Sequence, residues 1–384
     1  MKRLFAVLCR KIKKRGKLRL KEWEGNKFGR LFQIELFGES HSKEIGVIIK
    51  GVPEKTKLDF SFIQNELNRR RPGQNNITSQ RNESDHFIIT EGVKNKVTNG
   101  KKIKIIIPNT DVHSEDYKEF EEIYRPSHID YPVRLRYGSD INIIGSGRFS
   151  GRLTAPIVAA GAIAKIILNK IGVKIAAYVS QIGSIKDAKE YSVDQIQEKV
   201  ESNLVRTLDS KIAQKMEILI ENIKQNKDSI GGVITVQIEN CPAGLGDPWF
   251  ASLKTDLAAG ILSIPSTRGI EFGEGFKAAT MIGSEHNDSY ILKNGHISTK
   301  TNHCGGIIGG ISIGTPIVFR VAIKPTSSIG KSQKTLNFKT KKTVDLKIKG
   351  RHDPCIVPRI LVVIEAMSAI VLVDHWLNSQ IHSI

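Results

Sequence analysis

Two histidines stand in loops whose neighbouring residues suit them to proton transfer. His41 follows the hydroxyl of Ser40 in the segment Gly-Glu-Ser-His, directly after a stretch that is typical of a β-strand. His128 comes three residues after Arg125 in the segment Arg-Pro-Ser-His-Ile-Asp-Tyr, where a proline stiffens the chain. An imidazole changes its charge near neutral pH, and an arginine beside it could hold an anion in the same place. Taken alone, His41 is better explained as an ordinary loop residue, and His128 has the same alternative explanation.

Arginine is concentrated in two further segments. Arg69, Arg70 and Arg71 precede Pro-Gly and cannot all face the same way at the end of a helix. One or two of them could hold a carboxylate or phosphate by the fork geometry of guanidinium, although cations also suit a solvated helix C-terminus. The segment 145–154, Gly-Ser-Gly-Arg-Phe-Ser-Gly-Arg-Leu-Thr, runs into an apolar stretch. Its glycines let backbone N–H groups approach a ligand, and a helix N-terminus adds positive potential, so the segment is typical of an anion site.

Three segments nearer the C-terminus also combine glycine with polar side chains. They are NHCGGIIGG at 302–310, KPTSS at 324–328 and GRHDPC at 350–355. Within the last of them, Asp353 stands between a histidine and a proline. It is a candidate general base held in a rigid turn, and the alternative is an aspartate that only forms the turn or caps a helix.

A mixture of strands and helices must position these loops. We predict strands at 28–37, 46–51, 102–108 and 232–239, and helices at 60–71, 155–170, 256–262 and 360–376. Segment 155–170 is apolar on nearly all sides, which predicts a buried helix with Thr154 as its N-cap and Pro156 in its first turn. Segment 196–226 mixes charge with helical periodicity. No Gly-x-Gly-x-x-Gly motif follows a strand, so a Rossmann domain is not indicated and the pattern predicts a mixed α+β fold.

The basic charge of the chain is unevenly distributed. Of the net charge of +19 over 384 residues, residues 1–22 hold ten lysines and arginines and one acid, which is +9, and the rest carries +10. We treat residues 1–24 as a basic extension, either a disordered or transit-like tail or an over-extended start, and residues 25–384 as one catalytic domain. The excess charge could attract nucleic acid or an anionic small molecule. Aromatic residues are only 6% and no basic stripe carries stacking rings, so we expect no nucleic-acid partner.

Cysteine usage and hydropathy place limits on the class of protein. The four cysteines show no Cys-x-x-Cys spacing, so we expect no metal site and no disulfide framework, and the pattern fits a reducing compartment. No apolar run approaches the roughly 20 residues that span a bilayer, so we expect a cytoplasmic protein without membrane contact.

Ten motifs, taken together and in order, resemble the chorismate synthase family. The similarity runs from about Gly25 to His375. The motifs are GESH (38–41), RRRPG (69–73), the NTD–S–DY pattern (109–117), RPSHIDY (125–131), GSGRFSGRLT (145–154), DSIGG (228–232), PAGLGDP (242–248), NHCGGIIGG (302–310), KPTSS (324–328) and GRHDPC (350–355). The resemblance implies a β-α-α-β sandwich, with helices packed between two mainly antiparallel sheets, and a homotetramer. It also implies the anti-1,4-elimination of phosphate from 5-enolpyruvylshikimate 3-phosphate to give chorismate, the last common step of the shikimate pathway. The reaction would require reduced FMN, with NADPH as one candidate reductant.

The resemblance also implies roles for individual residues. His41 would protonate the leaving phosphate, His128 would protonate the flavin near N1, and Asp353 would help the flavin accept the substrate proton. The proton relay would include Ser40 and Ser150, and the substrate anions would be held by Arg70, Arg125, Arg152 and Arg351. The positions that correspond to FMN contacts are Arg148, Phe149, Ser150, Pro265, Ser266, Gly309, Lys324, Pro325, Thr326, Ser327, Ser328 and Arg351.

The chain departs from the family pattern in several of these loops. Serine replaces glycine at 42, 127 and 146, and further changes are Asn76, Ile129, Phe149, Gly151 and Leu153. A serine forced into a positive φ would cost on the order of 1 kcal/mol. The residues with predicted chemical roles all remain, which favours a working enzyme of a divergent lineage. The alternatives are a slow or decayed enzyme and a non-catalytic flavin- or phosphate-binding paralogue.

Overall fold

The structure is a computed structural model. It describes residues 24–74, 83–110, 120, 122–138, 141, 144–293, 295–348 and 353–382. The predicted basic extension, apart from Glu24, and the predicted substrate ligand Arg351 lie outside the described residues.

The first sheet is formed by the N-terminal part of the chain. Its strands are antiparallel and lie in the order β1 (Lys27–Phe28), β2 (Gln33–Gly38), β3 (Glu44–Lys50), β7 (Ile103–Pro108) and β4 (Ile88–Glu91). Along β7 the burial alternates, so Ile103, Ile105 and Ile107 face the core. This alternation is the period of two expected for a strand with one buried face.

The second sheet is also antiparallel and contains the longest strands. Its order is β11 (Thr267–Phe272), β16 (Ile317–Ile323), β10 (Gly232–Glu239), β8 (Lys174–Ile182) and β9 (Ile185–Lys186). The register pairs Val236 of β10 with Phe319 of β16, and both side chains are buried.

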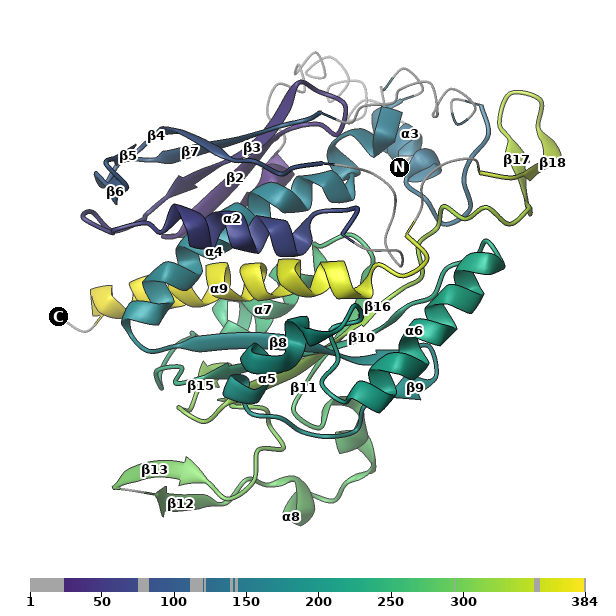
Figure 1. Ribbon diagram of the computed structural model, residues 1–384. Helices are drawn as coiled ribbons and strands as arrows, with labels where there is room; N and C mark the ends of the chain where they lie inside the picture. The colour runs from purple at the N-terminus through teal and green to yellow at the C-terminus, as the bar shows by residue number, and fades with distance from the viewer. Residues whose placement is uncertain are drawn as a thin grey trace, which may run out of the picture.

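Helices fill the space between the two sheets (Figure 1). Helix α4 (Thr154–Lys170) contacts the first sheet, α9 (Val357–His382) contacts the second, and the two helices pack on each other, with α2 (Phe60–Arg70) and α7 (Leu253–Leu262) beside them. The order of layers is therefore sheet, helices, helices, sheet. The predicted β-α-α-β sandwich is confirmed.

The described residues also form elements outside these two sheets and four helices. The other helices are α3 (Asp130–Tyr137), α5 (Val193–Lys199), α6 (Ser210–Gln225) and α8 (Gly283–His286), with 3₁₀ turns that include η3 (Ile144–Phe149) and η4 (Gly151–Leu153). Hairpins are formed by β5 (Val93–Lys94) with β6 (Val97–Thr98), β12 (Tyr290–Lys293) with β13 (His296–Thr299), β14 (Ile307–Ile308) with β15 (Ile311–Ser312), and β17 (Gln333–Asn337) with β18 (Lys342–Leu346).

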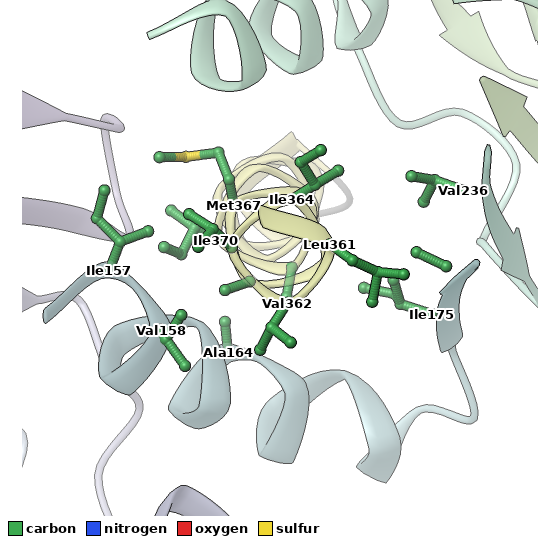
Figure 2. Close-up of a cluster of buried hydrophobic side chains, with 14 of the residues drawn as sticks. Ile157, Val158, Ala164, Ile175, Val236, Leu361, Val362, Ile364, Met367 and Ile370 are labelled. Atoms are coloured by element: carbon green, nitrogen blue, oxygen red, sulfur yellow. The ribbon is translucent and has the colours of Figure 1, made fainter. Parts of the chain in front are cut away.

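The contact between α4 and α9 is the centre of the core. Figure 2 shows α9 surrounded by side chains of α4, among them Ile157 and Val158, and of the second sheet, among them Val236. Gly161 of α4 lies against α9 so closely that a Cβ there would be 2.3 Å from the Cβ of Ala366. Glycine therefore sets how near the two helices approach.

Most of the predicted strands and helices are present near the predicted residues, and three predictions differ from the structure. Segment 28–37 is interrupted, because the N–H groups of residues 30–32 donate to the carboxylate of Asp374 at 2.6–2.9 Å instead of to a strand. Segment 196–226 is two helices, separated by a turn in which Arg206 has a φ of 60°. Thr154 does not cap α4 but is its first residue, because the turn η4 leads straight into the helix.

Within the part of the chain that the structure describes, two helical stretches are long and apolar enough to cross a membrane by length and composition alone. They are Ile144–Lys170 and Val357–Ile381, and their most apolar windows are 83% and 89% buried inside the protein. Core helices between two sheets have this same composition, because both of their sides face apolar neighbours.

Candidate active site

The loop that carries Ser40 and His41 packs against the glycine loop η3. The hydroxyl of Ser40, which is fully buried, donates to the carbonyl of Gly145 at 2.8 Å and lies 3.0 Å from Nδ1 of His41. A Cβ at Gly145, where φ is 60°, would be 1.9 Å from the imidazole ring. Glycine at this position therefore allows the loop to close on His41, and Ser40 fixes the orientation of the ring.

His128 contacts the same glycine loop through the next residue. Its Nε2 lies 3.4 Å from the hydroxyl of Ser146, and its Nδ1 lies 2.9 Å from Oδ1 of Asp130. Burial lowers the pKa of His128, and the nearby charges of Arg125 and Lys324 lower it further, against the opposite effect of Asp130. The imidazole is therefore biased towards its neutral form. The two predicted histidines meet one loop at adjacent residues.

The segment 324–328 connects His128 to Asp353. The hydroxyl of Ser327 donates to the carbonyl of Ser127 at 2.9 Å, and that of Thr326 donates to the carbonyl of Asp353 at 3.1 Å. The amine of Lys324 donates to Ser327 at 2.6 Å. This segment follows β16, so a central strand of the second sheet positions the bridge between the two predicted proton-transfer residues.

Asp353 faces the end of helix α2. Its Oδ2 accepts a hydrogen bond of 2.6 Å from Arg359, whose Nε donates to the carbonyl of Arg70 at 3.3 Å. Asp353 is mostly buried, with 12% of its side chain exposed. Arg359 thus joins the predicted carboxylate to the predicted substrate-binding helix end.

Arg70 and Arg152 meet at a shared carboxylate. Asp85 forms an ion pair of 3.2 Å with Arg70 and a short one with Arg152, and all three side chains are buried. Nε of Arg152 also donates to Asn109 at 2.8 Å, and its Nη2 lies 3.6 Å from Glu83. Both guanidinium groups are therefore fixed in position by acidic partners.

The three consecutive arginines diverge as predicted. Arg69 turns to the interior on the other side of α2, where it pairs with Glu66 at 2.8 Å, with Glu365 at 2.9 Å and with Glu201 at 2.6 Å. This ionic group lines a cavity of about 220 Å³. Arg71 is exposed. Of the three, Arg70 alone points to Asp85.

Arg125 stands beside His128, yet its guanidinium is engaged by Asp130. Nε and Nη2 of Arg125 donate to the two carboxylate oxygens of Asp130 at 2.8 and 2.7 Å. The guanidinium also lies over the ring of Phe120, 4.4 Å from its centroid. The side chain predicted to hold a substrate anion therefore already has a fixed carboxylate partner.

The other predicted cofactor ligands divide into two groups. Nε of Arg148 pairs with Glu39 at 3.1 Å, Phe149 is 36% exposed, and the hydroxyl of Ser150 caps η4. The carbonyl of Ser266, after Pro265, accepts from the N–H of Lys324 at 3.0 Å, and Pro325 and Ser328 belong to the same bridge segment.

Gly309 does not join this group within one chain. It lies in the turn between β14 and β15. Gly306, just before β14, is close to Pro316, just before β16. Lys324 follows the other end of β16, and a strand of seven residues spans about 20 Å.

The serine replacements have different backbone conformations. Ser127 and Ser146 have φ of 54° and 72°, as expected for positions that favour glycine, whereas Ser42 does not have a positive φ. The hydroxyl of Ser42 instead donates to the carbonyl of Glu39 at 2.7 Å and accepts from its N–H at 2.9 Å. Two of the three substitutions therefore strain the backbone.

Sequence reasoning missed the acidic and basic partners of the predicted residues. These are Glu83, Asp85, Asp130 and Arg359. Asp130 could have been found from its place two residues after His128. Asp85 has no comparable signal, because only folding brings it to Arg70 and Arg152.

The cations and hydroxyl groups gathered here fit an anionic, phosphate-bearing ligand. Lys324 has a lowered pKa because it is partly buried and because Arg268 is close. Two nearby cations of this kind attract negative charge, and hydroxyl groups such as those of Thr326 and Ser327 supply directional hydrogen bonds.

Comparison with known proteins agrees with this architecture. A family profile described as chorismate synthase matches residues 32–377. Chorismate synthase of Synechocystis sp. is 47% identical over 358 residues, which is 93% of this chain and 98% of the relative, and that of Methanosarcina barkeri is 43% identical over 355 residues, which is 92% and 97%. A solved structure titled "Crystal Structure of Chorismate Synthase" superposes with a TM-score of 0.71 at 29% identity, covering 91% of this chain and 93% of the other. The chain therefore belongs to the chorismate synthase family.

Proposed function

We propose that this chain removes phosphate from 5-enolpyruvylshikimate 3-phosphate by an anti-1,4-elimination and releases chorismate. The observation that supports this most directly is a continuous series of contacts between loops far apart in sequence. It runs from His41 through Ser40 and the glycine loop to His128, and from Ser127 through the segment 324–328 to Asp353. Proton donors and acceptors joined in this way can serve one bound molecule.

The substrate carries one phosphate and two carboxylates, so binding it requires cations. Arg70 and Arg152 are the buried candidates, and Asp85 holds their guanidinium groups side by side. A substrate anion would have to share these guanidinium groups with Asp85 or replace it. Arg351 remains a predicted ligand.

Reduced FMN is the proposed cofactor, and when bound it would supply the electronic part of the elimination. Lys324, Thr326 and Ser327 would hold its anionic groups, together with Arg148 and the loop around Ser266. His128 would hold and exchange a proton at Nε2, and His41 would donate one to the leaving phosphate. The source of electrons for FMN, with NADPH among the candidates, stays a prediction.

A homotetramer and a cytoplasmic location are part of the same proposal. The β12–β13 hairpin supports self-association, because Tyr290, Leu292 and Ile297 are 66%, 76% and 75% exposed. Apolar side chains gathered on one exposed hairpin are typical of protein–protein contacts. We propose no nucleic-acid partner and no membrane partner.

The proposal is tested by anaerobic turnover. The full chain is incubated with dithionite-reduced FMN and 5-enolpyruvylshikimate 3-phosphate, and phosphate release and chorismate absorbance are followed. We expect both products in equal amounts, and none when FMN is left out. FMN binding without phosphate release would support the non-catalytic paralogue instead.

Replacing one histidine tests the assigned proton transfer. We expect His128→Ala to lower kcat by about 10²-fold or more, because general acid–base catalysis contributes roughly 10²–10⁴-fold. The matched control is His286→Ala in α8, whose ring lies against His303. His286 is not part of the loop cluster, by which we mean residues 38–41, 125–131, 145–150 and 324–328 with Asp353. A full rate in His128→Ala would remove the assigned role.

A further inference from the structure

Asp130 is a buried acidic residue beside the candidate site. It is the first residue of α3 and is fully buried. Burial acts to raise the pKa of Asp130, but the hydrogen bonds from Arg125 and His128 outweigh burial and hold the pKa far below its usual range. The carboxylate is therefore ionised and can only accept hydrogen bonds.

The contact between Asp130 and His128 determines which ring nitrogen carries a proton. Oδ1 of Asp130 lies 2.9 Å from Nδ1 of His128, and an ionised carboxylate must receive a hydrogen there. In the neutral imidazole the proton therefore resides on Nδ1, and Nε2 presents a lone pair. Nε2 is the nitrogen that lies 3.4 Å from Ser146 on the glycine loop.

Arg125 in turn holds Asp130 in this orientation. Two parallel hydrogen bonds fix the plane of the carboxylate, and the backbone N–H of Arg125 donates to Oδ2 at 3.0 Å. Three of the hydrogen bonds to Asp130 thus come from one residue, and the fourth comes from His128. Arg125, Asp130 and His128 form a relay in which each member orients the next.

We propose that Asp130 is a positioning residue that keeps the Nδ1–H form of His128, so that every proton His128 gains or loses passes through Nε2. When Nε2 binds a proton, the imidazolium charge is stabilised by the carboxylate of Asp130. When Nε2 releases that proton, the neutral Nδ1–H form returns. The expected effect on kcat rests on the proposed function, whereas the expected tautomer of His128 does not.

A second consequence concerns Arg125. Its guanidinium binds the carboxylate of Asp130, so it acts on the substrate only through Asp130 and His128. Arg125→Lys keeps the charge but not the two parallel hydrogen bonds, so the loss should appear in kcat. The KM for 5-enolpyruvylshikimate 3-phosphate should stay within about threefold of wild type. A large rise in KM with unchanged kcat would instead make Arg125 a direct anion ligand.

The tautomer can be measured without cofactor or substrate. The full chain is labelled with ¹⁵N-histidine, and long-range ¹H–¹⁵N spectra at pH 8 distinguish the Nδ1–H and Nε2–H forms of His128, assigned with His128→Ala. We expect Nδ1–H in wild type. In Asp130→Asn the amide can donate to Nδ1, so the Nε2–H form should dominate. A wild-type spectrum with the Nε2–H form overturns the proposal by itself, even if the variant does not fold.

Another aspartate–histidine pair supplies the matched control, with His375 buried and the side chain of Asp256 22% exposed. Asp256 lies 2.8 Å from Nε2 of His375, outside the loop cluster. Asp256→Asn should change the signals of His375 and leave those of His128 and the value of kcat unchanged. If Asp130→Asn and Asp256→Asn lowered kcat equally, a general loss of packing would explain the result. The positioning role of Asp130 would then be rejected.

Kinetics then link the tautomer to turnover. For Asp130→Asn we expect kcat to fall at least 10²-fold with KM within about threefold, and Asp130→Glu to recover part of the rate. Unchanged kcat in a folded variant with the altered tautomer contradicts the proposal. If wild type itself forms no chorismate, the proposed function fails, while the spectra still decide the role of Asp130.

Discussion

At the scale of single residues, the two strained serines offer a test of backbone energetics. Ser127 has a φ of 54°, a conformation that costs a non-glycine residue about 1–2 kcal/mol. We expect Ser127→Gly to raise the free energy of unfolding by about 0.5–1 kcal/mol, because the relief exceeds the added entropy of the unfolded chain. Urea denaturation monitored by circular dichroism measures the change.

Ser42→Gly is the matched control for this prediction. Ser42 does not have a positive φ, and its hydroxyl forms hydrogen bonds with Glu39 and Glu44. The substitution should therefore lower the free energy of unfolding by about 1 kcal/mol. Equal effects of the two glycines would show that backbone strain is not what separates these positions.

The residues of the candidate site were predictable by type but not by partner. Short motifs singled out His41, His128 and Asp353 as candidates, because they are proton-transfer side chains in loops rich in glycine or proline. The sequence spacing places Asp130 near His128, but it does not show that the same carboxylate binds the guanidinium of Arg125, which the turn at Ser127 allows. Sequence shows which groups are present, and folding decides which of them neutralise each other.

At the scale of elements, the contact between α4 and α9 depends on Gly161. A Cβ at this position would lie 2.3 Å from the Cβ and 2.5 Å from the Cα of Ala366. Overpacking of this kind costs about 1–3 kcal/mol, more than the roughly 1 kcal/mol that alanine adds to helix propensity. We expect Gly161→Ala to lower the free energy of unfolding by about 1–2 kcal/mol, measured by urea denaturation.

Gly260 of α7 is the corresponding control. A Cβ there would meet the flexible side chain of Met367 at 3.0 Å, which can move aside. Gly260→Ala should therefore not lower the free energy of unfolding, and the helix propensity of alanine should raise it by up to about 1 kcal/mol. A loss of unfolding free energy as large as that of Gly161→Ala would mean that helix packing is equally tight at both positions. The backbone contact with Ala366 would then not explain the effect at Gly161.

Element prediction succeeded where local pattern and burial agree. The segment 232–239 is β10 without change, and the helix predicted at 60–71 is α2 but for its last residue. It failed where a distant group competes for the backbone. Asp374 binds the N–H groups near Leu31, and the turn at Arg206 exists because its carbonyl receives the N–H of Val179 at 2.8 Å.

At the scale of the whole molecule, the exposed hairpin gives the prediction for assembly. We expect the wild-type chain to be a tetramer, and the double substitution Leu292→Asp with Ile297→Asp to yield a smaller species, because charge on the hairpin cannot be buried without a large cost. Light scattering coupled to size-exclusion chromatography measures the mass. Ile218→Asp, at a residue 56% exposed on α6, is the control and should leave the mass unchanged.

The central place of α9 has a consequence for how the chain reaches its native state. The salt bridge from Glu365 to Lys165 joins residues 200 positions apart, and the bond from Asp374 to Arg30 joins residues 344 positions apart. Contacts so distant along the chain make folding slow, because long loops must close before the contacts form. During that interval the apolar sides of α4 and α9 face water, where they favour aggregation. The yield of active protein should therefore depend on chaperones and temperature during synthesis.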